Sequence, residues 1–157
     1  MSERSADRQL FDPERVIEVM ANHDVRYVLI GATAARLQGF PRLTADVDIT
    51  PERTTENLTN LAAALVALDA RIFVDGIPDG LAFEVDASTL HRADNWNLIT
   101  SAGRVDILFT PLGTTGFSDL ERNAVQFAIG DIPIRAASLS DILRCKRASN
   151  RVQDRAD

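Results

Sequence analysis

The stretch Arg42–Thr50, RLTADVDIT, places two aspartates one residue apart in a segment with the composition of a β-strand. Side chains alternate between the two faces of a strand, so Asp46 and Asp48 share one face while Val47 and Ile49 share the other. Two carboxylates roughly 6 to 7 Å apart at their Cα atoms repel each other unless water or a cation neutralises them. The alternation therefore predicts a strand whose polar face converges on a metal ion, and carboxylate oxygens favour Mg²⁺ or Mn²⁺.

A third carboxylate recurs in the same phase on a later segment, GRVDILFT (103–110), where Asp106 alternates with apolar residues. If this strand pairs beside the first at about 4.8 Å, the carboxylates of Asp46, Asp48 and Asp106 meet on one patch. Such a set suits two metal ions that assist an in-line phosphoryl displacement. Each aspartate alone is an ordinary solvated residue, whereas three in phase on two strands favour a functional site.

The residues before this strand predict a place for an anion. In VLIGATAARLQG (28–39) an apolar strand runs directly into a short helix, which Gly31 opens and Gly39 closes. The free N–H groups and the dipole at a helix start favour anions, and a glycine there allows close approach. Arg42 and Thr44 lie just before the aspartates and are predicted to bind phosphate.

The remaining pattern alternates helices and strands. Asp12 followed by proline and a periodic apolar set predicts a helix to about residue 22, and a second amphipathic helix follows a cap at Thr54 or Thr55. A strand is predicted at 71–74 and a loop at 75–95, with a short helix or strand within 83–90. Two hairpins are predicted, with turns at Ala102-Gly103 and Gly130-Asp131. These signals predict one α+β domain over 1–157, with a core at about 12–137 and a C-terminal helix at about 138–157.

Composition limits the class of protein. The chain has 157 residues, a net charge of −6 and 45% hydrophobic residues, which is typical of a globular domain and argues against a broad phosphate-binding surface. No apolar run approaches the roughly 20 residues that span a bilayer, no signal-peptide pattern opens the chain, and the single Cys145 cannot form an internal disulfide. We therefore expect a cytoplasmic protein without a membrane partner.

Lys146 is the only lysine among 17 basic residues. A compact ammonium with three donors cannot be replaced by a guanidinium where space is tight, so Lys146 is either required for a bound anion or retained by chance on the surface. It falls in the predicted C-terminal helix, which starts at Ser138 or Ser140. Lys146 lies beside that helix's predicted apolar stripe of Ile142, Cys145, Ser149, Val152 and Ala156.

In this order, the pieces resemble the nucleotidyltransferase superfamily related to DNA polymerase β. The family pattern is an apolar strand, a glycine followed by a small residue, a short helix, Asp-x-Asp on the next strand and a later single Asp. Here the pattern appears as VLIGATAARLQGFPRLTADVDIT (28–50) and GRVDILFT (103–110). The segment RLTADVDI resembles more closely the Arg-x-Thr-x-Asp-x-Asp of the small prokaryotic branch around the abortive-infection Eii-type toxins.

The resemblance implies a central mixed β-sheet flanked by helices, and a Mg²⁺- or Mn²⁺-dependent enzyme. Its reaction would move NMP from an NTP to a hydroxyl of RNA, such as a tRNA end, or of protein. By position, Asp46 and Asp48 would bind both metals, and Asp106 would bind the catalytic metal and accept the acceptor's proton. The residues implied to hold the nucleotide are Gly31, Ala32, Arg42, Thr44, Lys146, Arg151 and Asp154. The branch also implies a toxin–antitoxin system with a cognate partner protein.

Two alternatives belong to other classes. The family usually carries glycine or serine where this chain has Ala32, which favours a catalytically weak binding module that acts as an antitoxin or regulator. The letters DVDIT (46–50) also match the Asp-x-Asp-x-Thr nucleophile motif of haloacid dehalogenase-type phosphatases. That family needs an apolar strand before the first aspartate, and RLTA (42–45) is not apolar. Its downstream acidic pair is also missing.

Overall fold

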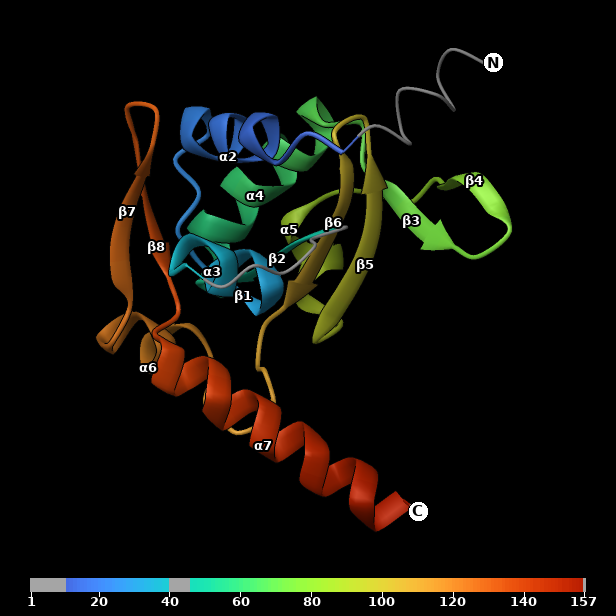
Figure 1. The fold of residues 1–157 in the computed structure, drawn as a ribbon. Coiled ribbons are helices and arrows are strands. Elements are labelled where there is room, and N and C mark those ends of the chain that lie inside the picture. The colour runs from blue at the N-terminus through green and yellow to red at the C-terminus, as the bar shows by residue number, and fades with distance from the viewer. Residues whose placement is uncertain (1–10, 40–45, 157) are drawn as a thin grey trace.

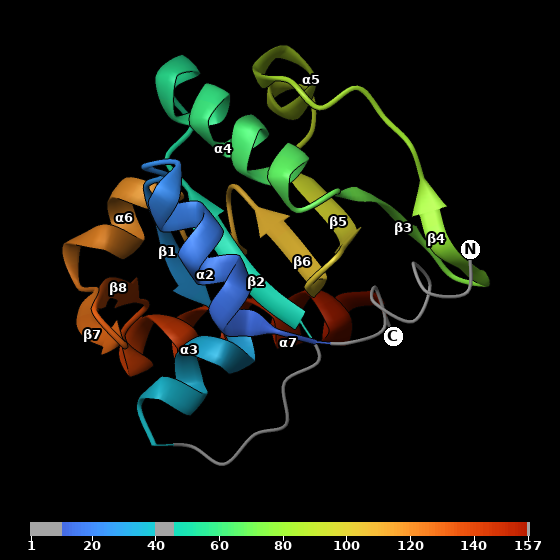
Figure 2. The same ribbon diagram turned by 90° about the horizontal axis from the view of Figure 1, so that it is seen from above.

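A mixed sheet of eight strands runs through the part of the chain that the computed structural model describes, residues 11–39 and 46–156, with side chains as far as 152 (Figures 1 and 2). The strand order is β4-β3-β5-β6-β2-β1-β8-β7. The pairs β2·β6 and β1·β8 are parallel, and the other neighbours are antiparallel. The strands are β1 (Tyr27–Ile30), β2 (Asp46–Pro51), β3 (Arg71–Val74), β4 (Ile77–Leu81), β5 (Asn95–Thr100), β6 (Gly103–Leu108), β7 (Val125–Ile129) and β8 (Ile132–Ala136).

Side-chain oxygens cap the start of several helices. Asp12 accepts from the backbone N–H of Arg15, and Thr54 accepts from that of Asn57. Each bond satisfies a donor that the first turn leaves unpaired. The helices are α2 (Pro13–Asn22), α3 (Gly31–Leu37), α4 (Thr55–Ala67), α5 (Ala87–His91), α6 (Phe117–Arg122) and α7 (Leu139–Ala156). Among the described residues, no helix is both long enough and apolar enough to cross a membrane.

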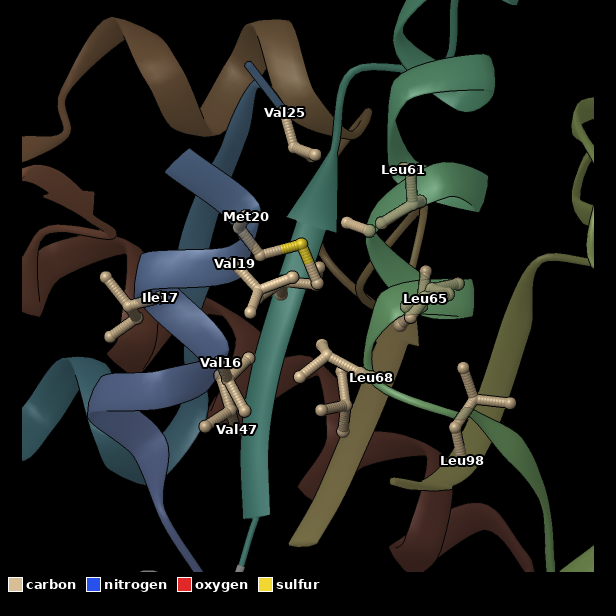
Figure 3. Packing of buried hydrophobic residues seen from close by; sticks show 14 of the residues in the cluster. Val16, Ile17, Val19, Met20, Val25, Val47, Leu61, Leu65, Leu68 and Leu98 are labelled. Atoms are coloured by element: carbon tan, nitrogen blue, oxygen red, sulfur yellow. The ribbon is translucent and has the colours of Figure 1, made fainter. Parts of the chain in front are cut away.

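One face of the sheet carries the main core. The apolar sides of α2 and α4 pack there. Figure 3 shows Met20 of α2 and Leu61 and Leu65 of α4 beside β2, with Val16 of α2 next to Val47. The alternation predicted for β2 and β6 is confirmed, because Val47, Ile49, Val105 and Ile107 are fully buried on this face. The polar residues between them therefore point to the opposite side of the sheet.

The opposite face is covered only in part. A smaller apolar cluster seats α6 and the start of α7 against β1, and it comprises Val28, Ile30, Phe117, Leu120 and Ala137 with Ile142 packed against it. Figures 1 and 2 show α7 on the side of the sheet away from α2 and α4. The polar face of β2, β6 and β5 lies beside this cluster.

Three local predictions need correction. The β5–β6 turn is formed by Ser101 and Ala102, since Gly103 already pairs with Thr100. The predicted loop at 75–95 contains β4, which pairs with β3, whereas the short helix or strand predicted within 83–90 is the helix α5. The predicted apolar stripe of α7 is only partly buried: Val152 is 51% exposed, whereas Ala148 is buried, because the last turns of α7 extend past the elements that cover its start (Figure 1).

Candidate active site

The three predicted carboxylates converge on the open face of the sheet. β2 and β6 pair directly, and their register sets Asp48 opposite Asp106 and Asp46 opposite Arg104. Asp46, Asp48 and Asp106 each offer an oxygen atom, and these atoms lie within 4.8 Å of one another. Thr33 of α3 donates a hydrogen bond of 3.1 Å to the carbonyl of Asp46 and so ties the start of β2 to the preceding helix. The predicted pairing of the two aspartate strands is confirmed.

The proximity of the three carboxylates, together with their burial, raises the pKa values of Asp48 and Asp106. Burial, together with the charges of Asp46 and Asp106, raises the pKa of Asp48 to about 7. Burial and a hydrogen bond with Asp46 raise the pKa of Asp106 to about 6, although Arg104 acts in the opposite direction. Carboxylates held this close are costly when all are ionised. A divalent cation offsets that cost, and hard oxygen donors suit Mg²⁺ or Mn²⁺, so the three residues fit the predicted metal site.

Arg104 is a member of the site whose contacts the sequence did not reveal. Its Nη2 donates to both oxygens of Asp106, at 3.0 and 3.3 Å. The guanidinium stacks on the ring of Phe73, 3.8 Å from the centroid, and its side chain is 29% exposed. Its Nε is buried without a hydrogen-bond partner among the described residues. Arg104 therefore supplies one fixed positive charge beside the carboxylates and orients Asp106.

Gly31 stands at the junction of β1 and α3 with a positive φ of 67°. A Cβ built on it would lie 2.4 Å from Oδ2 of Asp48, so no larger residue fits while Asp48 keeps its position. The sequence predicted that Gly31 leaves room for a ligand. The structure gives a second reason for a glycine at this position, because the absence of a Cβ leaves room for the carboxylate of Asp48.

A cavity of about 520 Å³ opens from the carboxylates towards α7. Gly31, Ala32, Asp48 and Asp106 line one part of it, and Lys146 lines it from α7. The other walls are mostly apolar and include Ile30, Leu108, Pro111, Leu112, Ala137, Ile142 and Cys145. The arrangement places acidic groups, helix-start amides and one ammonium around a space whose remaining surface suits a flat organic group.

An ion-pair cluster anchors the helix that carries Lys146. Arg144 donates from both Nη atoms to the two oxygens of Asp119 on α6, at 3.1 and 3.0 Å. Its Nη2 also lies 3.1 Å from Asp141, one turn earlier on α7. A bidentate guanidinium–carboxylate pair fixes direction as well as distance. These contacts hold α7 against α6 at a position two residues before Lys146.

The other predicted nucleotide ligands are placed differently. Arg42 and Thr44 lie outside the described residues, as does the side chain of Asp154. Arg151 is exposed and does not line the cavity. Cys145, expected in the core, is half-buried on the cavity wall, and burial raises the pKa of its thiol.

Comparison with known proteins bears on the fold. No family model matches the sequence, and no curated protein matches it significantly. A crystal structure at 1.87 Å resolution of a Thermotoga maritima protein, described as a "putative nucleotidyltransferase", matches with a TM-score of 0.62 at 16% sequence identity. The match covers 94% of this chain and 92% of that one.

The two chains share one fold. The predicted α+β class is confirmed, and the likeness supports the predicted nucleotidyltransferase fold. At this identity, any activity has to be argued from the residues, and the relation to the abortive-infection branch stays a prediction.

Proposed function

We propose that the protein is a metal-dependent nucleotidyltransferase that moves NMP from an NTP to a hydroxyl group of RNA, with a tRNA end as the first candidate. The observation that carries the proposal is the convergence of Asp46, Asp48 and Asp106. Two of them, Asp48 and Asp106, line a cavity together with Gly31 and Lys146. The shared fold with the Thermotoga protein is in accord with this reaction.

The three carboxylates would hold Mg²⁺ or Mn²⁺, which polarises the phosphoryl oxygens and neutralises charge on the leaving pyrophosphate. Asp106 accepts the proton of the attacking hydroxyl as its oxygen bonds to the α-phosphorus. The bond from the α-phosphorus to the bridging oxygen breaks, and pyrophosphate leaves. Without a bound metal ion the pKa of Asp106 is about 6, so the carboxyl is already ionised at neutral pH and holds no proton that would block this step.

The cavity divides the work of binding the nucleotide. We assign the triphosphate to the part lined by Gly31, Ala32 and Lys146, where the start of α3 and the ammonium favour anions. The apolar walls formed by the loop after β6 and by α7 receive the base and ribose. Arg42 and Thr44 precede the triad in the sequence and are proposed as further phosphate ligands.

The proposal is tested by incubating the protein with each α-³²P-labelled NTP, Mg²⁺ or Mn²⁺, and bulk tRNA or total cell protein. We expect label to appear on the tRNA, and expect the transfer to be lost in Asp48→Asn and Asp106→Asn. Glu84→Gln is a matched control, because Glu84 lies away from the triad and does not line the cavity. Absence of label from every acceptor, with no nucleotide binding under either metal, would contradict the proposal.

A binding module is the second candidate, and Arg104 favours it. Because Arg104 already pairs with Asp106, part of the acidic charge is neutralised without a metal ion. A chain of this kind could act as an antitoxin or regulator through a partner protein. Nucleotide binding without turnover, unchanged by Asp46→Asn, would support this reading over the enzyme.

A further inference from the structure

Asn97 continues the line of polar residues across the sheet beyond the carboxylates. On β5, Asn97 stands directly opposite Asp106 of β6. Asp106 stands opposite Asp48 of β2. Asp48 stands opposite Ile30 of β1, the residue before Gly31. One row perpendicular to the strands thus runs from Ile30, next to Gly31, through the two carboxylates to Asn97. Asn97 lines the same cavity as Asp48, Asp106 and Lys146.

The side chain of Asn97 has no structural task among the described residues. Leu98, its neighbour on β5, is buried in the main core, and Trp96 is tied to α5 through a hydrogen bond to the carbonyl of Leu90. Asn97 itself is exposed and makes no side-chain hydrogen bond to another described residue. Its carboxamide therefore keeps two donors and an acceptor for a ligand in the cavity.

The direction of the proposed reaction gives this end of the row a role. In an in-line displacement the attacking oxygen and the leaving oxygen lie on opposite sides of the phosphorus. The leaving pyrophosphate is assigned to Gly31 and Lys146, and Gly31 follows Ile30 at the β1 end of the row. The attacking hydroxyl must then approach from the β5 end, past Asp106, and Asn97 is the side chain that stands there.

We propose that Asn97 binds the acceptor and orients it by hydrogen bonding to the hydroxyl adjacent to the one that attacks, as in the 2′,3′-diol of an RNA 3′ end. The inference rests on the proposed nucleotidyl transfer. A ribose 2′-hydroxyl both donates and accepts, which matches a carboxamide and distinguishes RNA from DNA. Arg147 and Arg151 are exposed on α7, the helix that carries Lys146, and exposed arginines favour the backbone of a nucleic acid.

The test compares two tRNA minihelices, one ending in ribose and one ending in 2′-deoxyribose, with wild type, Asn97→Ala and Asn95→Ala. Asn95 is the matched control, because it lies on the same face of β5 and is exposed but does not line the cavity. We expect Asn97→Ala to lower kcat/KM on the ribose-ended acceptor by roughly 10- to 100-fold, the scale of a lost positioning contact. We expect little change on the 2′-deoxy acceptor and an unchanged KM for the NTP. Asn95→Ala should match wild type on both acceptors.

Four results would overturn the inference. Equal losses on both acceptors would show that Asn97 contacts no 2′-hydroxyl, and a raised KM or Kd for the NTP would place it in the nucleotide site. Full activity of Asn97→Ala on the ribose-ended acceptor would remove any role. Label on protein but not on RNA would contradict the proposal that Asn97 binds the diol of an RNA 3′ end. If wild type transfers nothing to any acceptor, the proposed function fails first, and this inference fails with it.

Discussion

Gly31 and Asp48 are packed so closely that a Cβ on residue 31 would lie 2.4 Å from Oδ2 of the aspartate. The same glycine adopts a φ of 67°, a backbone conformation that residues with a Cβ rarely adopt. One residue therefore satisfies two demands, the turn from β1 into α3 and the seat of a carboxylate in the candidate metal site. The strand β1, Gly31 and Asp48 therefore depend on one another for their positions.

Replacement of Gly31 by alanine should damage the site more than it damages the fold. The positive φ costs about 1 kcal/mol, and the displaced Asp48 should weaken Mn²⁺ binding at least tenfold. Gly130→Ala is the matched control, because φ is 60° there and nothing lies within 4 Å of a built Cβ. Urea denaturation and Mn²⁺ titration measure the two effects separately. Equal Mn²⁺ affinity in the two variants would show that Gly31 does not seat Asp48.

The metal-free protein should lose stability as pH rises from 5 to 8. The pKa of Asp48 is about 7 in the folded chain against 3.8 for an unperturbed aspartate, and that of Asp106 is about 6. Between these values the folded state holds protons that the unfolded state has released, so the free energy of unfolding falls with rising pH. Thermal melts at fixed ionic strength should therefore give a lower Tm at pH 8 than at pH 5.

A divalent metal should reverse that trend, since it binds the ionised carboxylates and only the folded chain brings them together. Saturating Mn²⁺ should raise Tm more at pH 8 than at pH 5. In Asp48→Asn both the pH slope and the metal effect should shrink. A Tm that does not change between pH 5 and 8 in the wild type would argue against the raised pKa values of Asp48 and Asp106.

Lys146 should contribute to nucleotide binding in a way that arginine cannot reproduce. Lys146→Arg keeps the charge but needs more room in the cavity, and Lys146→Ala removes the charge. We expect Kd for an NTP to rise roughly tenfold in both, about 1.4 kcal/mol. Arg147→Ala, a neighbouring exposed cation that does not line the cavity, serves as the control. Isothermal titration calorimetry with a non-hydrolysable NTP measures the effect. Full affinity in Lys146→Ala would show that Lys146 has no part in nucleotide binding.

Arg104 should set the acid limb of the pH–rate profile. Because its guanidinium lowers the pKa of Asp106, Arg104→Leu should move that limb of kcat/KM to higher pH. Arg53→Leu is a matched control, since Arg53 also stacks on a phenylalanine, at 4.5 Å from the ring of Phe109, and pairs with an aspartate away from the triad. A profile that shifts equally in both variants would point to a general loss of structure.

The triad could be predicted because strand alternation is a local rule. It places Asp46 with Asp48, and it places Asp106 on the polar side of its own strand. The contact between β2 and β6 could be stated only as a condition, since their pairing joins segments about 58 residues apart. Asn97 was missed for the same reason: its phase on β5 is visible in the letters NWN (95–97), but its place beside Asp106 depends on the strand order.

Other differences come from side chains and edges. Strand alternation puts Arg104 on the same face as Asp106. Its contacts, however, depend on how a long side chain lies across Phe73, which belongs to another strand. The strand β4 was hidden by Pro78 and Gly80, which are turn signals in sequence. At the edge of a sheet a proline is tolerated, and Gly80 is required because a Cβ there would lie 2.4 Å from the carbonyl oxygen of Ile72.

The most direct test of the central claim is a crystal structure of the protein with Mn²⁺ and a non-hydrolysable NTP, with the metal located by its anomalous scattering. The account predicts an anomalous peak bounded by the oxygens of Asp46, Asp48 and Asp106, with the triphosphate along Gly31 and within reach of Lys146. A cavity that binds nucleotide with no metal at the three carboxylates, or a metal bound elsewhere, would contradict it.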